Sequence, residues 1–148
     1  MSPNKKMKGV YVILGVLAIA NASAVVENKL RSSVGENCDT SLNTFEIQEF
    51  TVKPWPPSKN ENVSMTMKGV VHKDVTFASM EIYVKYSGFD FYHESIPESG
   101  SYKAGSTAEI DFKVYFPSIA PPGKYAVDVK VKDTNGNFLN CWEVKFSL

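Results

Sequence analysis

The chain of 148 residues contains two cysteines, Cys38 and Cys141, which could form one covalent cross-link. In a secreted chain two cysteines most simply form one disulfide bond, and two free buried thiols are the alternative. The bond would close a loop of about 100 residues and restrict the unfolded chain by roughly 4–5 kcal/mol, less any strain. The cysteines therefore predict a structural disulfide, provided that the chain enters an oxidising compartment.

The two histidines, His72 and His93, lie 21 positions apart, without cysteines or carboxylates at metal-ligand spacing around them. We therefore predict no metal site, no catalytic residues and no cofactor. A Ser-His-Asp triad stays open on residue types alone, but no nucleophile elbow supports it. Asp133–Asn137 resembles part of a calcium loop, but it lacks the length and the terminal glutamate, so a hairpin turn explains it. Asn62-Val63-Ser64 is an acceptor sequence for N-glycosylation at Asn62.

The N-terminus has the pattern of a secretory signal peptide. Lys5, Lys6 and Lys8 form a basic segment, an apolar run from Val10 to Ala20 follows, and Ala22-Ser23-Ala24 fits the cleavage pattern. The run is shorter than the roughly 20 apolar residues that span a membrane comfortably. We predict a signal peptide over residues 1–24, and an uncleaved signal anchor is the alternative.

The predicted mature protein, residues 25–148, has the length of one domain. Three lysines leave with the signal peptide, so 13 basic residues remain against 16 acidic ones. This mildly acidic composition, with lysines spread over alternating positions, predicts no nucleic-acid partner. We expect a soluble monomer.

Alternation of apolar and polar residues is the main structural signal after residue 44, and it predicts half-buried β-strands. Gln48-Glu49 interrupts the alternation, which predicts a bulge, and Asn135-Gly136 predicts the positive φ angles of a hairpin turn. The polar segment between Pro97 and Gly105 predicts a loop. The alternating segments are Phe45–Ile47, Phe50–Val52, Val63–Met67, Met80–Tyr86, Phe89–Phe91, Ile110–Phe116, Tyr125–Val131 and Phe138–Phe146. About seven strands without a helix predict an all-β, two-sheet sandwich.

The inward-facing positions of these strands are rich in aromatic residues and methionine, including Met65, Met67 and Met80. Such side chains are common where a protein adapts to a flexible apolar ligand, but they also fill ordinary cores. Composition alone leaves both interpretations open.

Several short motifs, in order, resemble the ML lipid-recognition domain. The opening half carries Pro54-Trp55-Pro56-Pro57, Asn62-Val63-Ser64-Met65-Thr66 and Lys68-Gly69-Val70-Val71. The closing half carries Phe116-Pro117, Pro121-Pro122-Gly123-Lys124-Tyr125, Asp133-Thr134-Asn135-Gly136 and Leu139-Asn140-Cys141-Trp142-Glu143-Val144. Within this family the pattern is most similar to phosphatidylglycerol/phosphatidylinositol transfer proteins, and the Cys-Trp-Glu block also resembles the Niemann-Pick type C sterol carrier.

The resemblance implies an immunoglobulin-like β-sandwich with an apolar cavity between its sheets, which binds the tails of a phospholipid or sterol. It pairs Cys38 with Cys141, the family's first and last cysteines. Gly88–Ser106 lacks the extra disulfides that many relatives carry there. Alternation and the resemblance together predict the lipid-binding residues, with Phe116, Ile119 and Pro121-Pro122 nearer the entrance. These residues are Met65, Met67, Ile82, Val84, Phe112, Val114, Phe116, Ile119, Tyr125, Val127, Trp142, Val144 and Phe146.

The resulting hypothesis is a secreted or endolysosomal carrier that moves lipid between membranes, touching the membrane surface transiently. The alternative is an immunoglobulin-like recognition or adhesion module with a filled core. An enzyme is the third function hypothesis, after these two. Trp55, among prolines, either contacts the membrane or closes the end of a strand.

Overall fold

The computed structural model of the chain describes residues 33–148, in which every regular element is a β-strand. The predicted signal peptide, residues 1–24, lies outside the described residues. The strands are β2 (Glu36–Asn37), β3 (Phe45–Lys53), β4 (Glu61–Val71), β5 (Val75–Tyr86), β6 (Phe89–Pro97), β7 (Ser101–Tyr102), β8 (Thr107–Phe116), β9 (Lys124–Asp133) and β10 (Trp142–Ser147). Across 33–148 we find no helix with the length and apolar character needed to cross a membrane.

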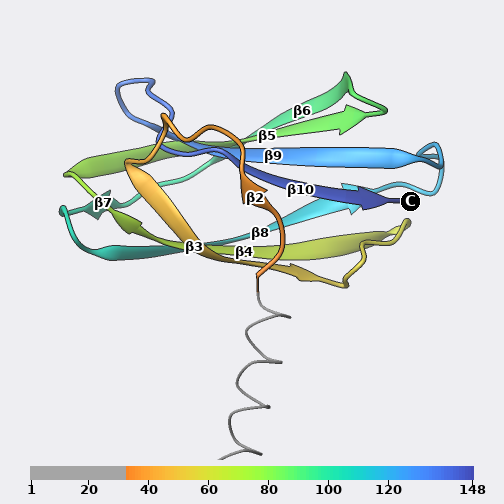
Figure 1. Cartoon of the computed structure of the whole chain (residues 1–148), viewed down its shortest axis with the longest axis horizontal. Helices are drawn as coiled ribbons and strands as arrows, with labels where there is room; N and C mark the ends of the chain where they lie inside the picture. The colour runs from red at the N-terminus through yellow and green to blue at the C-terminus, as the bar shows by residue number, and fades with distance from the viewer. Residues whose placement is uncertain (1–32) are drawn as a thin grey trace, which may run out of the picture. The chain divides into compact units, whose positions relative to one another are not determined.

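The strands form two antiparallel sheets, which lie one above the other in Figure 1. The large sheet has the order β2-β10-β9-β5-β6, with β7 paired to the start of β5, and the small sheet has the order β3-β4-β8. Seven strands contain six or more residues, as the alternation predicted. The all-β, two-sheet prediction is therefore confirmed for the described residues.

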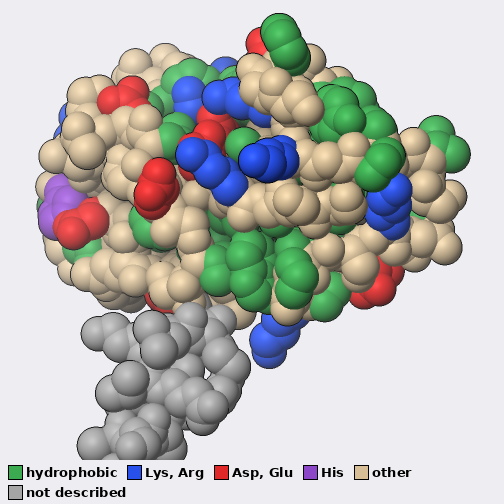
Figure 2. Space-filling view, turned by 45° about the vertical axis from the view of Figure 1, so that its right-hand side comes forward, with side chains coloured by type: hydrophobic (Ala, Val, Ile, Leu, Met, Phe, Trp, Pro, Cys, Tyr) green, Lys and Arg blue, Asp and Glu red, His purple; other side chains and the backbone are tan. Residues whose placement is uncertain are grey.

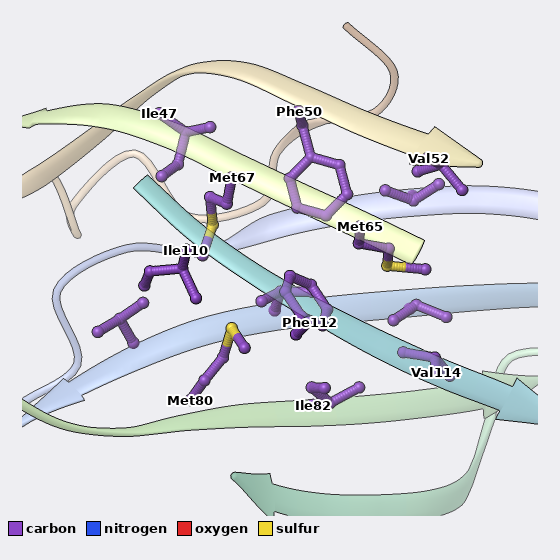
Figure 3. Packing of buried hydrophobic residues seen from close by; sticks show 14 of the residues in the cluster. Ile47, Phe50, Val52, Met65, Met67, Met80, Ile82, Ile110, Phe112 and Val114 are labelled. Carbon is purple, nitrogen blue, oxygen red and sulfur yellow. The ribbon is translucent and has the colours of Figure 1, made fainter. Parts of the chain in front are cut away.

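The core lies between the sheets, because each strand turns its apolar positions inward. In Figure 3, Phe50, Met65 and Phe112 from the small sheet point toward Met80 and Ile82 from the large sheet. None of these side chains is more than 7% exposed. Burying such side chains contributes about 1.5–3 kcal/mol each, which is the main force holding the sheets together.

The sequence predicted the small sheet well, including its irregularity. The pairing of β3 with β4 shifts between Ile47 and Glu49, where the alternation is interrupted. The extra residue keeps both Ile47 and Phe50 buried, although they are three positions apart. The predicted bulge is confirmed.

The hairpin between β9 and β10 differs from the prediction. Gly136 has a φ of 84°, but Asn135 is not among the residues with positive φ. The turn is held instead by Asp133, whose Oδ1 accepts hydrogen bonds from the amides of Asn135 and Asn137 at 2.9 and 2.8 Å. This arrangement satisfies the turn's amides with a side chain, so one glycine is enough.

The last strand is also shorter than predicted, because the ladder is interrupted before Trp142. The side chain of Asn140, which is 1% exposed, makes hydrogen bonds to β9 in place of backbone ladder bonds. Its Oδ1 accepts a hydrogen bond from the Val131 amide at 2.8 Å, and its Nδ2 donates one to the Val129 carbonyl at 3.4 Å. A buried asparagine that completes a ladder is invisible to an alternation pattern.

Two further segments differ in length from the prediction. β5 begins at Val75 rather than near Met80, because a register shift between Phe77 and Ser79 interrupts its alternation. The predicted loop between Pro97 and Gly105 contains the two-residue strand β7, which pairs with the start of β5.

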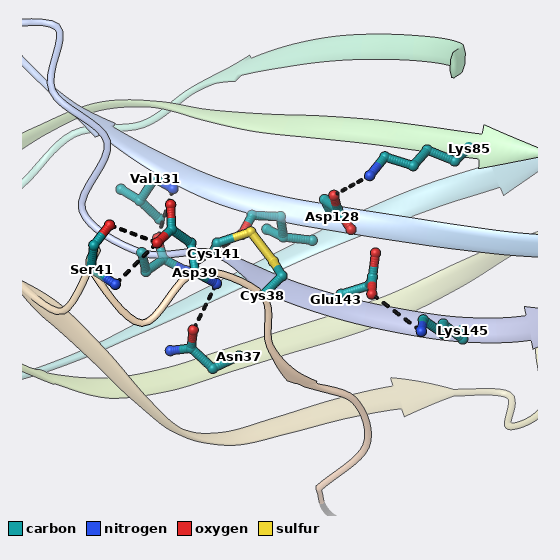
Figure 4. Close-up of a disulfide and its surroundings, with 12 residues drawn as sticks. Asn37, Cys38, Asp39, Ser41, Lys85, Asp128, Val131, Cys141, Glu143 and Lys145 are labelled. Atoms are coloured by element: carbon teal, nitrogen blue, oxygen red, sulfur yellow. Dashed lines mark hydrogen bonds and ion pairs between the residues drawn. A yellow bond between two sulfur atoms is a disulfide. The ribbon is translucent and has the colours of Figure 1, made fainter. Parts of the chain in front are cut away.

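The predicted disulfide is confirmed. Cys38 and Cys141 are bonded, with their Cα atoms 5.1 Å apart, and they lie 103 positions apart in the sequence (Figure 4). Beside it, β2 pairs with β10, so the bond joins the first described strand to the last. The Val34 amide also donates to the Phe50 carbonyl of β3 at 2.9 Å, and Phe50 stacks on Trp142 of β10 at 6.1 Å. We call this side of the sandwich, formed by β2, β10 and β3, the closed edge.

Candidate functional site

The edge opposite the disulfide is formed by β6 of the large sheet and β8 of the small sheet, which we call the open edge. No residue of β6 is fully buried. Yet Tyr92 is paired with Val84 and Glu94 with Ile82, and both partners on β5 are buried. Tyr92 and Glu94 therefore lie on the inner face of the sheet without being covered by β8, so the sheets part at this edge.

The space at the open edge is a groove of about 670 Å³. This volume lies within the range of about 300–1,000 Å³ that is usual for small-molecule sites. The groove is bounded by β6 on one side, by β8 on the other and by the segment 117–121 at one end. Its lining residues are Asn62, Val84, Phe91, Tyr92, Glu94, Lys113, Val114, Tyr115, Phe116, Pro117, Ile119, Ala120 and Pro121.

Large apolar side chains are concentrated around this groove. Six of them are exposed in residues 33–148, and Phe91, Tyr92, Tyr115 and Ile119 line the groove, with Ile119 87% exposed. Phe89, 76% exposed, begins β6. In Figure 2 green side chains gather over the right half of the view, with blue lysine or arginine side chains among them. We call Phe89, Phe91, Tyr92, Tyr115 and Ile119 the apolar rim. Such concentrations of exposed apolar side chains mark interaction sites.

An aromatic cluster supports the groove beneath Phe91. The Phe91 ring lies 5.8 Å from that of Tyr86 and 6.1 Å from that of Tyr125. Tyr125 in turn lies 6.0 Å from Phe116 and 5.9 Å from Phe146. Ring pairs at these separations add stability beyond the area they bury, so this end of the groove is preformed.

The segment that closes the end of the groove is held by two tyrosine hydroxyls. Tyr125 donates to the Pro121 carbonyl at 2.6 Å, and Tyr86 donates to the Pro122 carbonyl at 2.9 Å. Gly123 follows with a φ of 143°, and a Cβ atom there would lie 3.0 Å from the Tyr86 ring. Only glycine has both this backbone conformation and the room, so the loop depends on it.

Three polar side chains interrupt the apolar lining: Asn62, Glu94 and Lys113. Glu94 is half-buried, whereas Asn62 and Lys113 are exposed. Within residues 33–148, no ion pair or side-chain hydrogen bond involves Glu94 or Lys113. The groove therefore offers one anionic and one cationic group that are available to a ligand.

The structure places the predicted lipid-binding residues in two groups. Val84, Val114, Phe116 and Ile119 line the groove, together with Pro121 of the predicted entrance. The others face inward but pack against each other in the core instead of lining an open cavity. These are Met65, Met67, Ile82, Phe112, Tyr125, Val127, Val144 and Phe146, which are buried, and Trp142, which is half-buried.

Several lining residues were missed because β6 does not alternate. Phe91 was predicted to belong to a short strand, and Tyr92 and Glu94, which follow it, were assigned to no element and to no site. The signal that could have found them is the concentration of three large aromatic residues, Phe89, Phe91 and Tyr92, within four positions.

Both histidines lie outside the groove and contact glutamates. His72 Nε2 lies 2.6 Å from Glu46 Oε1, and His93 Nε2 lies 2.8 Å from Glu81 Oε1. Glu81 also accepts hydrogen bonds from Ser79 at 2.6 Å and from Ser95 at 2.7 Å. Burial raises the pKa of Glu81, but the bonds from Ser79, Ser95 and His93 outweigh it and hold the pKa at about 2.

A carboxylate pair lies beside the disulfide, as Figure 4 shows. Asp128 Oδ2 forms an ion pair with Lys85 Nζ at 3.1 Å. The neighbouring Asp128 carboxyl group, together with burial, raises the pKa of Glu143. Cys38, Asp128 and Cys141 bring possible metal-ligand atoms within 4.8 Å of one another. Both sulfurs belong to the disulfide, so they cannot act as thiolate ligands.

Comparison with known proteins bears on the family. The sequence profile of the ML domain matches residues 32–148. A protein of Dictyostelium discoideum, provisionally named a phosphatidylglycerol/phosphatidylinositol transfer protein, is 26% identical over 153 residues, covering 96% of this chain and 98% of that protein.

Two solved structures share the fold. The crystal structure of a Niemann-Pick type C2 protein from the Japanese carpenter ant has a TM-score of 0.62 at 11% identity, covering 77% of this chain and 98% of the other. Chicken MD-1, complexed with lipid IVa, has a TM-score of 0.53 at 12% identity, covering 74% and 84%. At these identities the likeness concerns the fold alone.

Proposed function

Because the chain belongs to the ML domain family, we propose that it binds a lipid in the open-edge groove and carries that lipid between membranes. The observation that carries the proposal is the groove of about 670 Å³, around which five of the six exposed large apolar side chains are found. In the absence of a ligand, such a surface is costly to leave in water.

The proposed ligand is a phospholipid, such as phosphatidylglycerol or phosphatidylinositol, or a sterol. The relative from Dictyostelium carries the first two in its name, and MD-1 was solved with lipid IVa. The apolar part of the lipid lies against Val84, Val114 and Phe116, and the head group remains near the exposed Asn62 and Lys113. The packed core residues support these walls from behind.

The energetics of such a carrier require no chemical step. Burying an acyl chain is worth about 0.8 kcal/mol per methylene against water, but a bilayer is equally apolar, so most of this gain is lost in exchange with a membrane. Binding and release are then nearly balanced. A bound lipid stabilises the folded protein in proportion to its occupancy.

The apolar rim is the proposed membrane contact. Phe89 and Ile119 are the most exposed of its side chains, at 76% and 87%; Phe89 begins β6, and Ile119 lies in the segment at one end of the groove. Aromatic residues are favoured at the boundary between water and lipid. The protein would touch the membrane through this rim as a monomer, within a secreted or endolysosomal compartment that maintains the disulfide.

Glycosylation at Asn62 is part of the same proposal. Asn62 is exposed on β4 and lines the groove, so a glycan there would stand beside its opening. The acceptor sequence and the disulfide both agree with passage through a secretory compartment.

A recognition module with a filled core is the second candidate, and one observation favours it. Nine of the thirteen predicted lipid-binding positions pack within the core, and eight of these nine are at most 9% exposed. In that case the groove would bind no lipid, and the apolar rim would contact another protein.

The test is mass spectrometry of the organic extract of the secreted, oxidised protein after incubation with mixed liposomes. One lipid class recovered near one-to-one with protein, together with a raised melting temperature, would support the carrier. No retained lipid and an unchanged melting temperature would leave the recognition module.

A further inference from the structure

We propose that Glu94 makes the groove selective for lipids whose head groups carry hydrogen-bond donors in addition to the phosphate. This inference rests on the proposed function, since it concerns the ligand of the same groove. It identifies a residue that sets specificity and the class of head group that it selects.

The orientation of Glu94 is fixed by its neighbours on β6. His93 and Ser95 both bond to Glu81, at 2.8 and 2.7 Å, on the outer face of the large sheet. Successive residues of a strand point to opposite faces, so Glu94 points inward. Its partner on β5, Ile82, is 1% exposed within the core.

A carboxylate is unusual at such a position, and this one has no partner within residues 33–148. The other half-buried or buried glutamates of the large sheet have partners: Glu81 contacts two serines and a histidine, and Glu143 contacts Lys145 at 3.6 Å. A charge on an edge strand also prevents that strand from pairing with another chain, and this role does not involve a ligand. Because Glu94 also lines the groove, it affects which ligands can bind there.

A lipid that fills the groove covers Glu94 and removes water from its carboxylate. Covering a charged acceptor without replacing its hydrogen bonds carries a large desolvation cost, whereas a hydrogen bond to a charged group is among the stronger ones. The covering head group must therefore donate hydrogen bonds, which glycerol and inositol hydroxyls and the ethanolamine ammonium can do. Choline has no N–H or O–H group and cannot.

Lys113 adds a cation at the β8 edge of the groove: it occupies an outer-face position of β8, and its side chain is among the groove's lining. Its ammonium is available to a phosphodiester, which carries one negative charge. The phosphomonoester of phosphatidic acid carries more charge and no further donor except its own proton, so the carboxylate of Glu94 disfavours it. The pair thus predicts that phosphatidylglycerol, phosphatidylinositol and phosphatidylethanolamine bind more tightly than phosphatidylcholine or phosphatidic acid with the same acyl chains.

The first test needs no substitution. Vesicles containing phosphatidylethanolamine, its N-monomethyl and N,N-dimethyl forms, or phosphatidylcholine are equilibrated with the secreted protein, and the bound lipid is measured after separation. Because the dimethyl form retains one N–H group, the proposal predicts the largest fall in affinity, about tenfold, at the last methylation. A gradual fall across the series, which size alone would produce, or no fall at all, overturns it.

The second test replaces Glu94 by leucine, with Glu109→Gln as the matched control. Glu109 is an exposed carboxylate on the outer face of β8 and does not line the groove. We expect wild type to bind phosphatidylglycerol about tenfold more tightly than phosphatidylcholine; Glu94→Leu should bring the two within about twofold of each other, while Glu109→Gln keeps the wild-type preference. Retained selectivity in Glu94→Leu refutes the role of Glu94.

The two proposals fail in different ways. If the wild-type protein binds none of these phospholipids and no sterol from the same vesicles, the proposed function is wrong; if it binds sterol alone, the selectivity of Glu94 is wrong. If it binds all of them equally, the lipid carrier stands and the selectivity of Glu94 is wrong.

Discussion

Replacing Phe91 with alanine should weaken lipid binding while leaving the fold nearly intact. The Phe91 side chain is 52% exposed in the groove wall. A fully covered aromatic side chain buries about 150–250 Å², so a lipid can cover roughly 100 Å² of this ring. At about 25 cal/mol per Å², this contact contributes at most roughly 2.5 kcal/mol. Since a lipid covers only part of the ring, we expect a loss of about 1–2 kcal/mol, or about 5- to 30-fold weaker binding.

The effect on stability should be small, because half of the Phe91 side chain is exposed and its ring pairs with Tyr86 and Tyr125 are at 5.8 and 6.1 Å. The matched control is Phe50→Ala in the core, where the side chain is 0% exposed. This substitution should cost about 3–5 kcal/mol of unfolding free energy, by loss of burial and by the cavity that it leaves. Because Phe50 does not line the groove, the affinity of the folded variant for lipid should change little.

The assay is equilibrium binding of a fluorescent phosphatidylglycerol, paired with urea unfolding of the same samples without lipid. Binding is measured at a temperature where both variants remain folded. Unchanged affinity in Phe91→Ala would place the ligand elsewhere and refute the groove as the site. Equal losses of stability in the two variants would show that Phe91 belongs to the core.

Two further predictions concern stability. Reducing the Cys38–Cys141 bond, which spans 103 positions, should lower the unfolding free energy by about 4–5 kcal/mol; an unchanged urea midpoint in the double alanine variant would contradict this. Because folding lowers the pKa of Glu81 from 4.5 to about 2, its contribution is present above about pH 4.5 and lost as the pH falls through about 2. Glu81→Gln should therefore lose up to about 3 kcal/mol at pH 7, and the difference from wild type should shrink in acid; a pH-independent difference in urea titrations would count against it.

The small sheet and the inward faces could be predicted from the sequence because their strands are covered on one side only. Alternation records this difference directly, as in β8, where buried and exposed residues alternate from Thr107 to Phe116. The bulge at Gln48-Glu49 was visible for the same reason, since it shifts the apolar set by one position.

The groove could not be predicted in this way, because its position depends on how far the sheets separate. Alternation states which face a residue occupies but not whether the opposite sheet reaches it. Ile82 and Glu94 are paired and share the inner face, yet Ile82 is buried in the core and Glu94 lines the groove. For the same reason the lipid-binding residues were predicted along the whole inner face, whereas in the structure the groove lies at one edge of the sandwich, between β6 and β8. Asn140 and Asp133 were missed because they replace backbone hydrogen bonds with side-chain ones.

The contrast between the closed edge and the open edge has a kinetic consequence. At the closed edge, the disulfide and the pairing of β2 with β10 tie the large sheet to the segment that leads into β3. At the open edge, β6 has a hydrogen-bonded neighbour on one side only and contributes no fully buried side chain. Such strands exchange their amide hydrogens through local opening at far less than the global unfolding free energy. Hydrogen exchange should therefore be fastest along β6 and slowest along β9, and lipid should enter and leave at the rate of this local opening, independently of global unfolding.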